Sequence, residues 1–175
     1  MSQPVYTIGH STRPIDEFIG LLQAQAITQL VDIRTVPRTR HNPQYEQDAL
    51  ATALTEAGIA YVYLKALGGL RPKVSESSNA GWRNQSFRNY ADYMQTEQFR
   101  HGLAELLHVS ESAPTAIMCA EAVPWRCHRS LVADALIARG VRVFDIINAG
   151  EPTLRRLTPF AVVGGVDVTY PGPAD

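Results

Sequence analysis

The feature that most constrains the fold is an alternation of short apolar segments with longer segments whose apolar residues recur at helical spacing. Runs of β-favouring residues predict strands at residues 5–8, 30–33, 59–64, 115–118 and 141–147. Helical periodicity predicts helices at residues 14–26, 46–57, 87–94, 97–109 and 127–139. This alternation is typical of a parallel sheet covered on both faces. We therefore predict an α/β fold with a single doubly wound, mostly parallel sheet of about five strands and helices on both faces.

The chain has the length of one domain, at 175 residues. We expect an α/β domain over residues 1–150 and a C-terminal extension over residues 151–175, packed on the same domain. Within the extension we expect one helical turn at residues 154–160 and an additional edge strand at residues 161–168. The stretch 65–85 is rich in Gly, Ser, Pro and Asn, and connections of that length are usually functional or mobile.

Charge and composition exclude several classes of protein. The net charge of −1 argues against a molecule that is basic overall and binds long nucleic acid or anionic membranes. No apolar run reaches the ~18 residues of a membrane span, and residues 1–20 lack the layout of a signal peptide. Two cysteines are too few for a secreted disulfide framework. We expect a cytoplasmic protein without a membrane partner.

The cations are unevenly distributed along the chain. Residues 34–41, 65–73 and 126–129 hold eight of the sixteen Lys and Arg residues and contain no Asp or Glu. In a doubly wound sheet, ligands bind where the loops follow the carboxyl ends of the strands. The predicted strands place the following candidate residues at that edge: His10, Ser11, Asp32, Arg34, Gly68, Gly69, Arg71, Cys119, Glu121, Cys127, His128 and Arg129.

The segment from Cys119 to Arg129 is the strongest chemical signal. A thiol becomes a nucleophile when it is ionised, and a helix N-terminus with nearby cations lowers its pKa from ~8.5. Cys127 stands where a helix should begin, between Arg126 and His128, and Cys119 stands where a strand should end. Phosphatases and sulfurtransferases use such a strand–loop–helix layout. The phosphatase spacing does not match, because Trp125 occupies the position of the phosphatase arginine.

We expect neither a metal nor a cofactor. Structural zinc usually takes ligands in pairs two to four residues apart, and the sequence offers only the adjacent Cys127 and His128. Neighbouring side chains on a helix point about 100° apart, so both cannot easily bind one ion. Structural roles also remain open for single residues, with His10 an ordinary loop histidine and Asp32 a brace for Arg34. The pair Gly68–Gly69 can be a plain turn.

Together these motifs resemble the family named domain of unknown function DUF488. The resemblance covers roughly residues 5–147. It implies a small bacterial or archaeal α/β protein whose shared polar residues gather at one site, and it supplies no reaction. The chain departs from the family at residues 123–125, where relatives often carry charged residues. The matching motifs are Thr7–Ser11, Val31–Arg34 with Pro37, Leu67–Gly69 with Arg71, Cys119–Glu121 and Cys127–Arg129.

The first function class that stays open is a thiol-dependent transferase or hydrolase acting on a small anionic substrate that bears a phosphate or a carboxylate. A fixed set of roles follows from that class. Cys119 or Cys127 is the nucleophile or redox thiol, and His10 or His128 is the general base. Glu121 or Asp32 orients that base. The cations that bind the substrate are Arg34, Arg71 and Arg129.

The alternative is a nucleotide- or nucleic-acid-binding or base-processing module. Its Arg-rich loops would neutralise phosphates, and Trp82, Trp125 or Tyr45 would stack on a base. In that case the cysteines are structural. A third class, a sensor or interaction domain without chemistry, also stays open, because a fold does not fix a function. The sequence does not indicate an oligomeric state.

Overall fold

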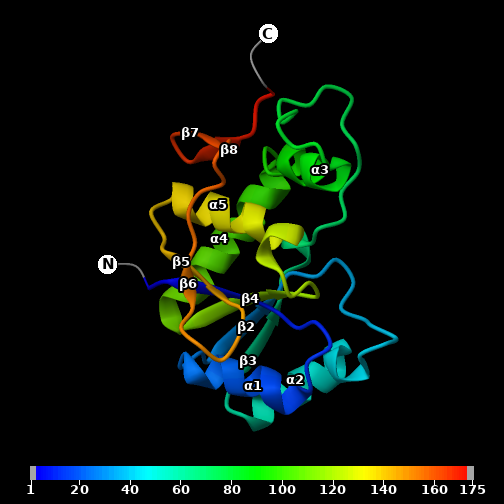
Figure 1. The fold of residues 1–175 in the computed structure, drawn as a ribbon, viewed down its shortest axis with the longest axis vertical. Helices are drawn as coiled ribbons and strands as arrows, with labels where there is room; N and C mark the ends of the chain where they lie inside the picture. Colours follow the sequence, from blue (N-terminus) through cyan, green and yellow to red (C-terminus); the bar gives the residue numbers. More distant parts are fainter. Residues whose placement is uncertain (1–2, 173–175) are drawn as a thin grey trace.

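The apolar, β-favouring segments form the strands of a central sheet, which confirms the predicted α/β class. The computed structural model describes residues 3–172. The sheet has six strands in the order β3-β2-β4-β1-β5-β6, and only β6 is antiparallel to its neighbour (Figure 1). The strands are β1 (Val5–Gly9), β2 (Gln29–Asp32), β3 (Ala60–Tyr63), β4 (Thr115–Cys119), β5 (Val143–Ile146) and β6 (Thr153–Leu154).

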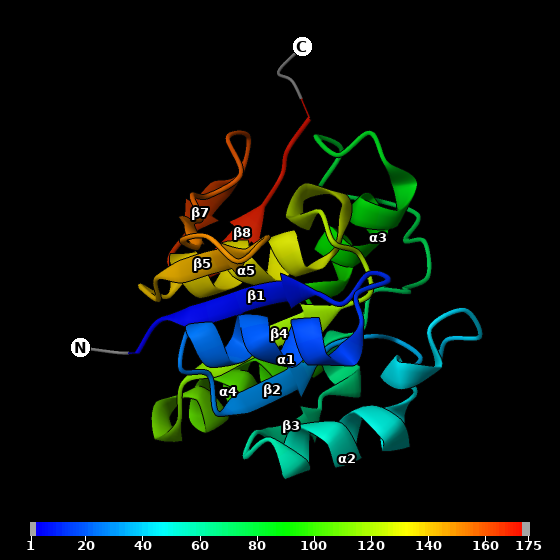
Figure 2. The same cartoon turned by 60° about the horizontal axis from the view of Figure 1, so that its bottom comes forward.

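Helices cover both faces of this sheet. They are α1 (Ile15–Ala24), α2 (Gln47–Glu56), α3 (Gln85–Tyr93), α4 (Glu97–Ser112) and α5 (Arg129–Ala138). The first two lie on one face and the other three on the opposite face, as Figures 1 and 2 show. Each face has its own apolar cluster, built around Phe18 and Leu50 on one side and Tyr90 and Leu131 on the other. In the described part of the chain, no helix has the length and apolar character needed to cross a membrane.

The order of the strands creates a switch point between β1 and β4. From β1 the chain crosses to β2 on one side of this pair, and from β4 it crosses to β5 on the other side. In open α/β sheets the loops separate at such a point and leave a crevice at the carboxyl ends of the strands. Here the N–H of His10 bonds to the carbonyl of Cys119 at 2.9 Å, and the N–H of Ser11 bonds to that of Ala120 at 2.9 Å. These bonds hold the two loops together at the base of the crevice.

The helix expected at residues 127–139 begins two residues later. A short 3-10 turn, Pro124–Arg126, precedes it, and Cys127 is extended, with φ −131° and ψ 146°. The helix α5 therefore starts at Arg129. As a consequence, Cys127 lies in front of the helix N-terminus instead of within its first turn.

The C-terminal extension differs from expectation in two places. Residues 154–160 form no helical turn, and β6 takes the edge position beside β5. The edge strand expected at residues 161–168 is wrong, because β7 (Val162–Gly164) and β8 (Asp167–Thr169) pair with each other in a separate two-stranded sheet. Gly165 has a φ of 66°, which is a conformation that glycine adopts readily and that suits a tight hairpin turn. The backbone groups of β7 and β8 hydrogen-bond to each other, so neither strand pairs with the edge of the central sheet.

The end of the extension is anchored by Tyr170, which is fully buried. Its hydroxyl donates to the carboxylate of Asp134 on α5 at 2.6 Å, and its backbone N–H donates to the side chain of Asn79 at 2.8 Å. Asn79 in turn donates to Asp92 of α3. The extension thus ties α5 to the loop that precedes α3.

Candidate functional site

A cleft of about 840 Å³ opens at the carboxyl ends of β1, β2 and β4. The loops after these three strands form most of its wall, and residues 69–70 and 86–87 complete it. Its position is the switch point where ligands bind in open α/β sheets. The predicted site residues that line it are His10, Ser11, Arg34, Gly69, Cys119, Glu121, Cys127 and His128.

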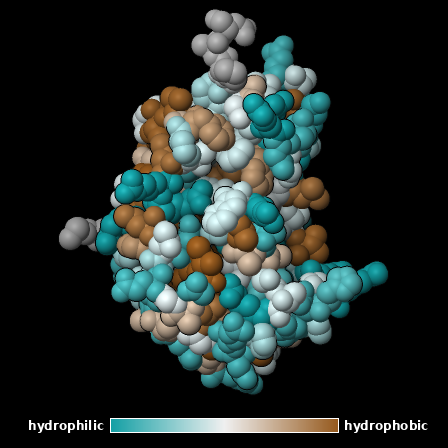
Figure 3. All heavy atoms as spheres, viewed as in Figure 1, coloured by the Kyte–Doolittle hydropathy of each residue, from teal (hydrophilic) through white to brown (hydrophobic). Residues whose placement is uncertain are grey.

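The cleft is basic. Arg38 and Arg40 from the loop after β2 and Arg126 from the turn before α5 line it, and all three are exposed. Glu121 is the only carboxylate residue among its lining residues. The loop after β2 projects from the molecule in Figure 1, and Figure 3 shows hydrophilic residues over that projection. The lining of the cleft therefore carries more positive than negative charge.

The two cysteines meet at the floor of the cleft. Cys119 is the last residue of β4, and Cys127 precedes α5 by two residues. Their sulfur atoms are in contact, and the structure pairs them as a disulfide. Cys119 is 2% exposed and Cys127 is 6% exposed. Both sulfur atoms therefore lie at the N-terminal end of α5.

Arg129 is a buried cation that contacts sulfur. Its side chain is fully buried, and its guanidinium donates to Cys119 Sγ at 2.9 Å and to the carbonyls of Glu121 and Ala122 at 2.5 and 3.0 Å. Burial lowers the pKa of Arg129 to about 10, so the group stays charged at neutral pH. No carboxylate of the described residues forms an ion pair with it. The Cys119 sulfur, 2.9 Å from the guanidinium, is the only side-chain partner of that group in the described residues.

His128 is oriented by a backbone carbonyl. Its Nε2 lies 2.9 Å from the carbonyl oxygen of Ile33, so Nε2 carries the proton that is donated there. Burial lowers the pKa of His128 to about 4, so the ring is neutral at pH 7 and Nδ1 is unprotonated. That bare nitrogen lies 3.5 Å from Cys127 Sγ. The arrangement is that of a thiol with an adjacent base.

His10 presents a second neutral imidazole to the cleft. Its Nδ1 donates to the carbonyl of Ser11 at 2.8 Å, and its ring stacks on Tyr45 with centroids 4.1 Å apart. Burial lowers the pKa of His10 to about 4. Its Nε2 is buried and has no hydrogen-bond partner in the described part of the chain. A buried acceptor without a partner is a candidate for bonding to a ligand.

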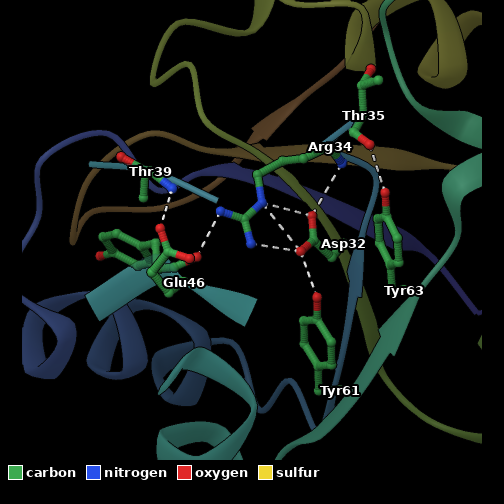
Figure 4. Close-up of polar contacts among 8 residues, drawn as sticks. Asp32, Arg34, Thr35, Thr39, Glu46, Tyr61 and Tyr63 are labelled. Carbon is green, nitrogen blue, oxygen red and sulfur yellow. Dashed lines mark hydrogen bonds and ion pairs between the residues drawn. The ribbon is translucent and has the colours of Figure 1, made fainter. Parts of the chain in front are cut away.

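Asp32 and Arg34 bind each other instead of a ligand. Both are buried, and the guanidinium bonds to both carboxylate oxygens, with its shortest contact at 2.7 Å (Figure 4). Arg34 also donates to the carbonyl of Tyr45, and the Tyr61 hydroxyl donates to Asp32 at 2.6 Å. This agrees with the reading of Asp32 as a brace for Arg34, and it leaves Arg34 few donors for a substrate.

The same network anchors the loop that carries Arg38 and Arg40. The hydroxyl of Tyr63 donates to the carbonyl of Thr35 at 2.7 Å, and the N–H of Thr39 donates to Glu46 at 2.6 Å (Figure 4). In residues 3–172, no hydrogen bond joins the carboxylate of Asp32 or Glu121 to an imidazole, and the imidazoles of His10 and His128 bond to the carbonyls of Ser11 and Ile33. Backbone carbonyls orient both histidines, so the expected role of a carboxylate in orienting the base is not met.

Asp32 and three other predicted residues lie outside the cleft lining. Gly68 packs against the backbone of Thr35. Arg71 donates to the carbonyls of Gly68 and Lys65, and its guanidinium lies 3.8 Å from the Tyr93 ring centroid. Arg129 is fully buried behind the cleft lining. Gly69 does line the cleft, and a Cβ there would lie 2.6 Å from His128 Nδ1, so only glycine leaves room for the base.

Several lining residues were not selected from the sequence. Arg38, Arg40 and Arg126 belong to the cation-rich stretches, and that clustering was the available signal for them. Val36 and Leu70 line the cleft and are 56% and 76% exposed, which no sequence pattern indicated. Across residues 3–172, no group of three or more His, Cys, Asp or Glu residues is arranged to hold a metal ion.

Fold and site together define a doubly wound α/β protein with a cysteine–histidine cluster at the switch point of its sheet. The chain belongs to the family described as Domain of unknown function DUF488, whose model matches residues 14–136 and so covers well over half of the chain. Neither the search of curated proteins nor that of solved structures returned a significant match. The family assignment confirms the resemblance and names no reaction.

Proposed function

We propose that the protein is a thiol-dependent enzyme that acts on a small anionic substrate, with Cys127 as the nucleophile. One observation carries this proposal. Cys127 Sγ lines the basic cleft, 3.5 Å from the bare Nδ1 of His128 and 3.5 Å from the backbone N–H of Arg129 at the start of α5. A base and a helix N-terminus are the two features that turn a thiol into a thiolate nucleophile.

In this mechanism each group around the sulfur has a defined task. His128 accepts the proton of the Cys127 thiol, because the thiolate that forms 3.5 Å away raises the pKa of the imidazole above its value beside a neutral sulfur. The N–H of Arg129 and the dipole of α5 stabilise that thiolate. Arg38, Arg40 and Arg126 attract the anionic substrate into the cleft. The bond from His128 to Ile33 holds the imidazole in the tautomer that accepts the proton.

The proposed thiol chemistry also indicates the cellular compartment in which the protein works. A cysteine pair that must return to the thiol form needs a reducing environment, and the cytoplasm provides one. We therefore place the protein in the cytoplasm. The reaction classes that fit a thiolate nucleophile include group transfer and hydrolysis.

The test compares two alkylating reagents that differ in charge. For the reduced protein, the test measures the rate of Cys127 alkylation by anionic iodoacetate divided by the rate with neutral iodoacetamide. This ratio should be higher in the folded protein than in the unfolded protein. The double substitution R38A/R40A should lower the iodoacetate rate alone. The matched control is R142A, which removes an exposed cation at the opposite edge of the sheet. Equal ratios in the folded and unfolded protein would refute the proposal.

A second candidate is a nucleotide-binding module without thiol chemistry. The observation that favours it is Trp125, which is 64% exposed beside Arg126 and is available to stack on a base. Titration of nucleotides into the protein, followed by its Trp fluorescence, tests this candidate. Binding that falls steeply with added salt and survives replacement of both cysteines by serine would favour this candidate.

A further inference from the structure

We infer that the substrate of this site is a low-molecular-weight disulfide bearing anionic groups, and that the reaction is thiol–disulfide exchange through Cys127 and Cys119. This inference rests on the proposed function, because it needs Cys127 as the nucleophile. It specifies that the bond attacked is the S–S bond of the substrate, and it assigns a role to Cys119.

The contact between the two sulfur atoms is the first support. Group transfer or hydrolysis needs one nucleophilic thiol, and a second thiol in contact with it has no task in those reactions. In exchange the second thiol is essential, because it resolves the mixed disulfide that the first thiol forms. Cys119 and Cys127 come from the end of β4 and from the segment before α5, and the fold brings their sulfurs together in an open cleft.

The surroundings of each sulfur match a different step. Cys127 is the more exposed of the two and has the base His128 beside it, which suits the first attack. Cys119 is more deeply buried and bonds to the Arg129 guanidinium, which no carboxylate of the described residues neutralises. A buried cation favours the thiolate form of Cys119, and the thiolate is the form that attacks a mixed disulfide.

The cleft supports a substrate larger than a simple oxyanion. Its volume is about 840 Å³, and its wall combines cations on two separate loops with the exposed apolar side chains of Val36 and Leu70. A small organic disulfide presents an apolar sulfur pair with polar groups on both sides. The buried, unpartnered Nε2 of His10 offers such a molecule one acceptor for an N–H or O–H donor.

A single turnover balances with the substrate disulfide and the two cysteines alone, and an external dithiol is the reductant for repeated turnover. The Cys127 thiol gives its proton to His128, and its sulfur attacks one sulfur of the substrate. A mixed disulfide forms, the substrate S–S bond breaks, and the leaving thiolate takes the proton from His128 and departs as a thiol. The Cys119 thiolate then attacks the Cys127 sulfur, so that the Cys119–Cys127 disulfide forms and the second thiolate is released. The substrate gains two electrons, the protein dithiol loses two, and an external dithiol restores the pair by the same exchange.

The experiment uses dithiobis(nitrobenzoate), a dianionic aromatic disulfide whose released thiolate is coloured. The reduced, folded protein should release two equivalents of thiolate and end as an intramolecular disulfide without a retained adduct. The variant C119S should release one equivalent and retain a nitrobenzoate adduct on Cys127, as found by mass spectrometry. The neutral reagent dithiodipyridine should react about tenfold more slowly than the dianion with the native protein. The double substitution R38A/R40A should remove that difference, and the control R142A should preserve it.

The outcomes separate this inference from the proposed function. A fast reaction that leaves a stable adduct on Cys127 of the native protein would overturn the exchange and keep the activated thiol. Equal rates for the two reagents would overturn the anionic substrate class. If both thiols react only after unfolding, the proposed function itself fails.

Discussion

His128 donates its Nε2–H to the carbonyl oxygen of Ile33, at 2.9 Å, and this bond determines which ring nitrogen faces Cys127. Ile33 directly follows β2, so the sheet itself fixes the orientation of the imidazole. The opposite nitrogen, Nδ1, is left without a proton and faces Cys127 Sγ at 3.5 Å. Many thiol enzymes use a side chain to orient the base, and here a backbone carbonyl takes that position.

Replacing Gly69 by alanine should displace the His128 ring, because the new Cβ would lie 2.6 Å from Nδ1. We expect alkylation of Cys127 at neutral pH to slow by about tenfold or more, since a displaced base no longer accepts the proton. The matched control is G20A, where nothing lies within 4 Å of the added Cβ. Unchanged reactivity of Cys127 in G69A would show that His128 does not activate the thiol.

Replacing Arg129 by methionine should affect both stability and Cys119. The change leaves the carbonyls of Glu121 and Ala122 without their donor in a buried environment, so we expect the free energy of unfolding to fall by about 3 kcal/mol. The pKa of the Cys119 thiol should rise, because its cationic partner is lost. Urea denaturation and the ultraviolet absorbance of the thiolate measure the two effects. The charge-conserving R129K should keep more of the Cys119 thiolate than R129M, and the reverse order would contradict this assignment.

Replacing Asp32 by asparagine should destabilise the loop after β2. Arg34 would lose a buried ionic partner, which costs about 3 kcal/mol in comparable sites. Removal of the Tyr61 hydroxyl with Y61F should cost about 1.5 kcal/mol, because one hydrogen bond to a charged group is lost. Urea denaturation measures both. The control Y6F removes a hydroxyl without a side-chain partner in the described residues and should have little effect. A D32N protein as stable as the native one would show that the pair contributes nothing.

The protein should lose stability as the pH falls from about 6.5 to about 4. Burial lowers the pKa of His10 and of His128 to about 4, whereas the unfolded chain binds protons near pH 6.5. The unfolded state therefore holds more protons in this window, and the free energy of unfolding rises with pH there. For His10 alone the loss between pH 7 and pH 5 is about 2 kcal/mol.

Urea denaturation at the two pH values tests this dependence. The variant H10Q should flatten the slope, and the control H101N should leave it unchanged, because His101 is 81% exposed. A slope that is the same in H10Q and in the native protein would contradict the assignment of the effect to His10.

Much of the fold could be predicted because hydrophobic periodicity reports burial directly. The five parallel strands and the five helices follow from that pattern, and so does the placement of Cys119 and Cys127 at one edge of the sheet. The C-terminal extension could not be predicted equally well. Residues 161–168 have the composition of a strand, but composition does not say which partner a strand pairs with.

The site was harder to predict because the sequence does not show which cations are buried. Asp32 and Arg34 are two residues apart in an extended segment, so their side chains share one face, and this spacing was the available sign of their pairing. Arg129 carried no comparable sign, since its partners are backbone carbonyls and a sulfur. Of the exposed cations that line the cleft, Arg38 and Arg40 come from a loop without periodicity and Arg126 from a short 3-10 turn.

The most direct test of the central claim is the pH dependence of Cys127 alkylation by iodoacetamide in the reduced, folded protein and in H128Q. Glutamine can still donate to the Ile33 carbonyl, whereas it lacks the base that Nδ1 provides. We predict that the native thiol titrates well below ~8.5 and that its midpoint moves up towards that value in H128Q. A native midpoint at ~8.5 or above, or a midpoint that H128Q leaves unchanged, would contradict the account.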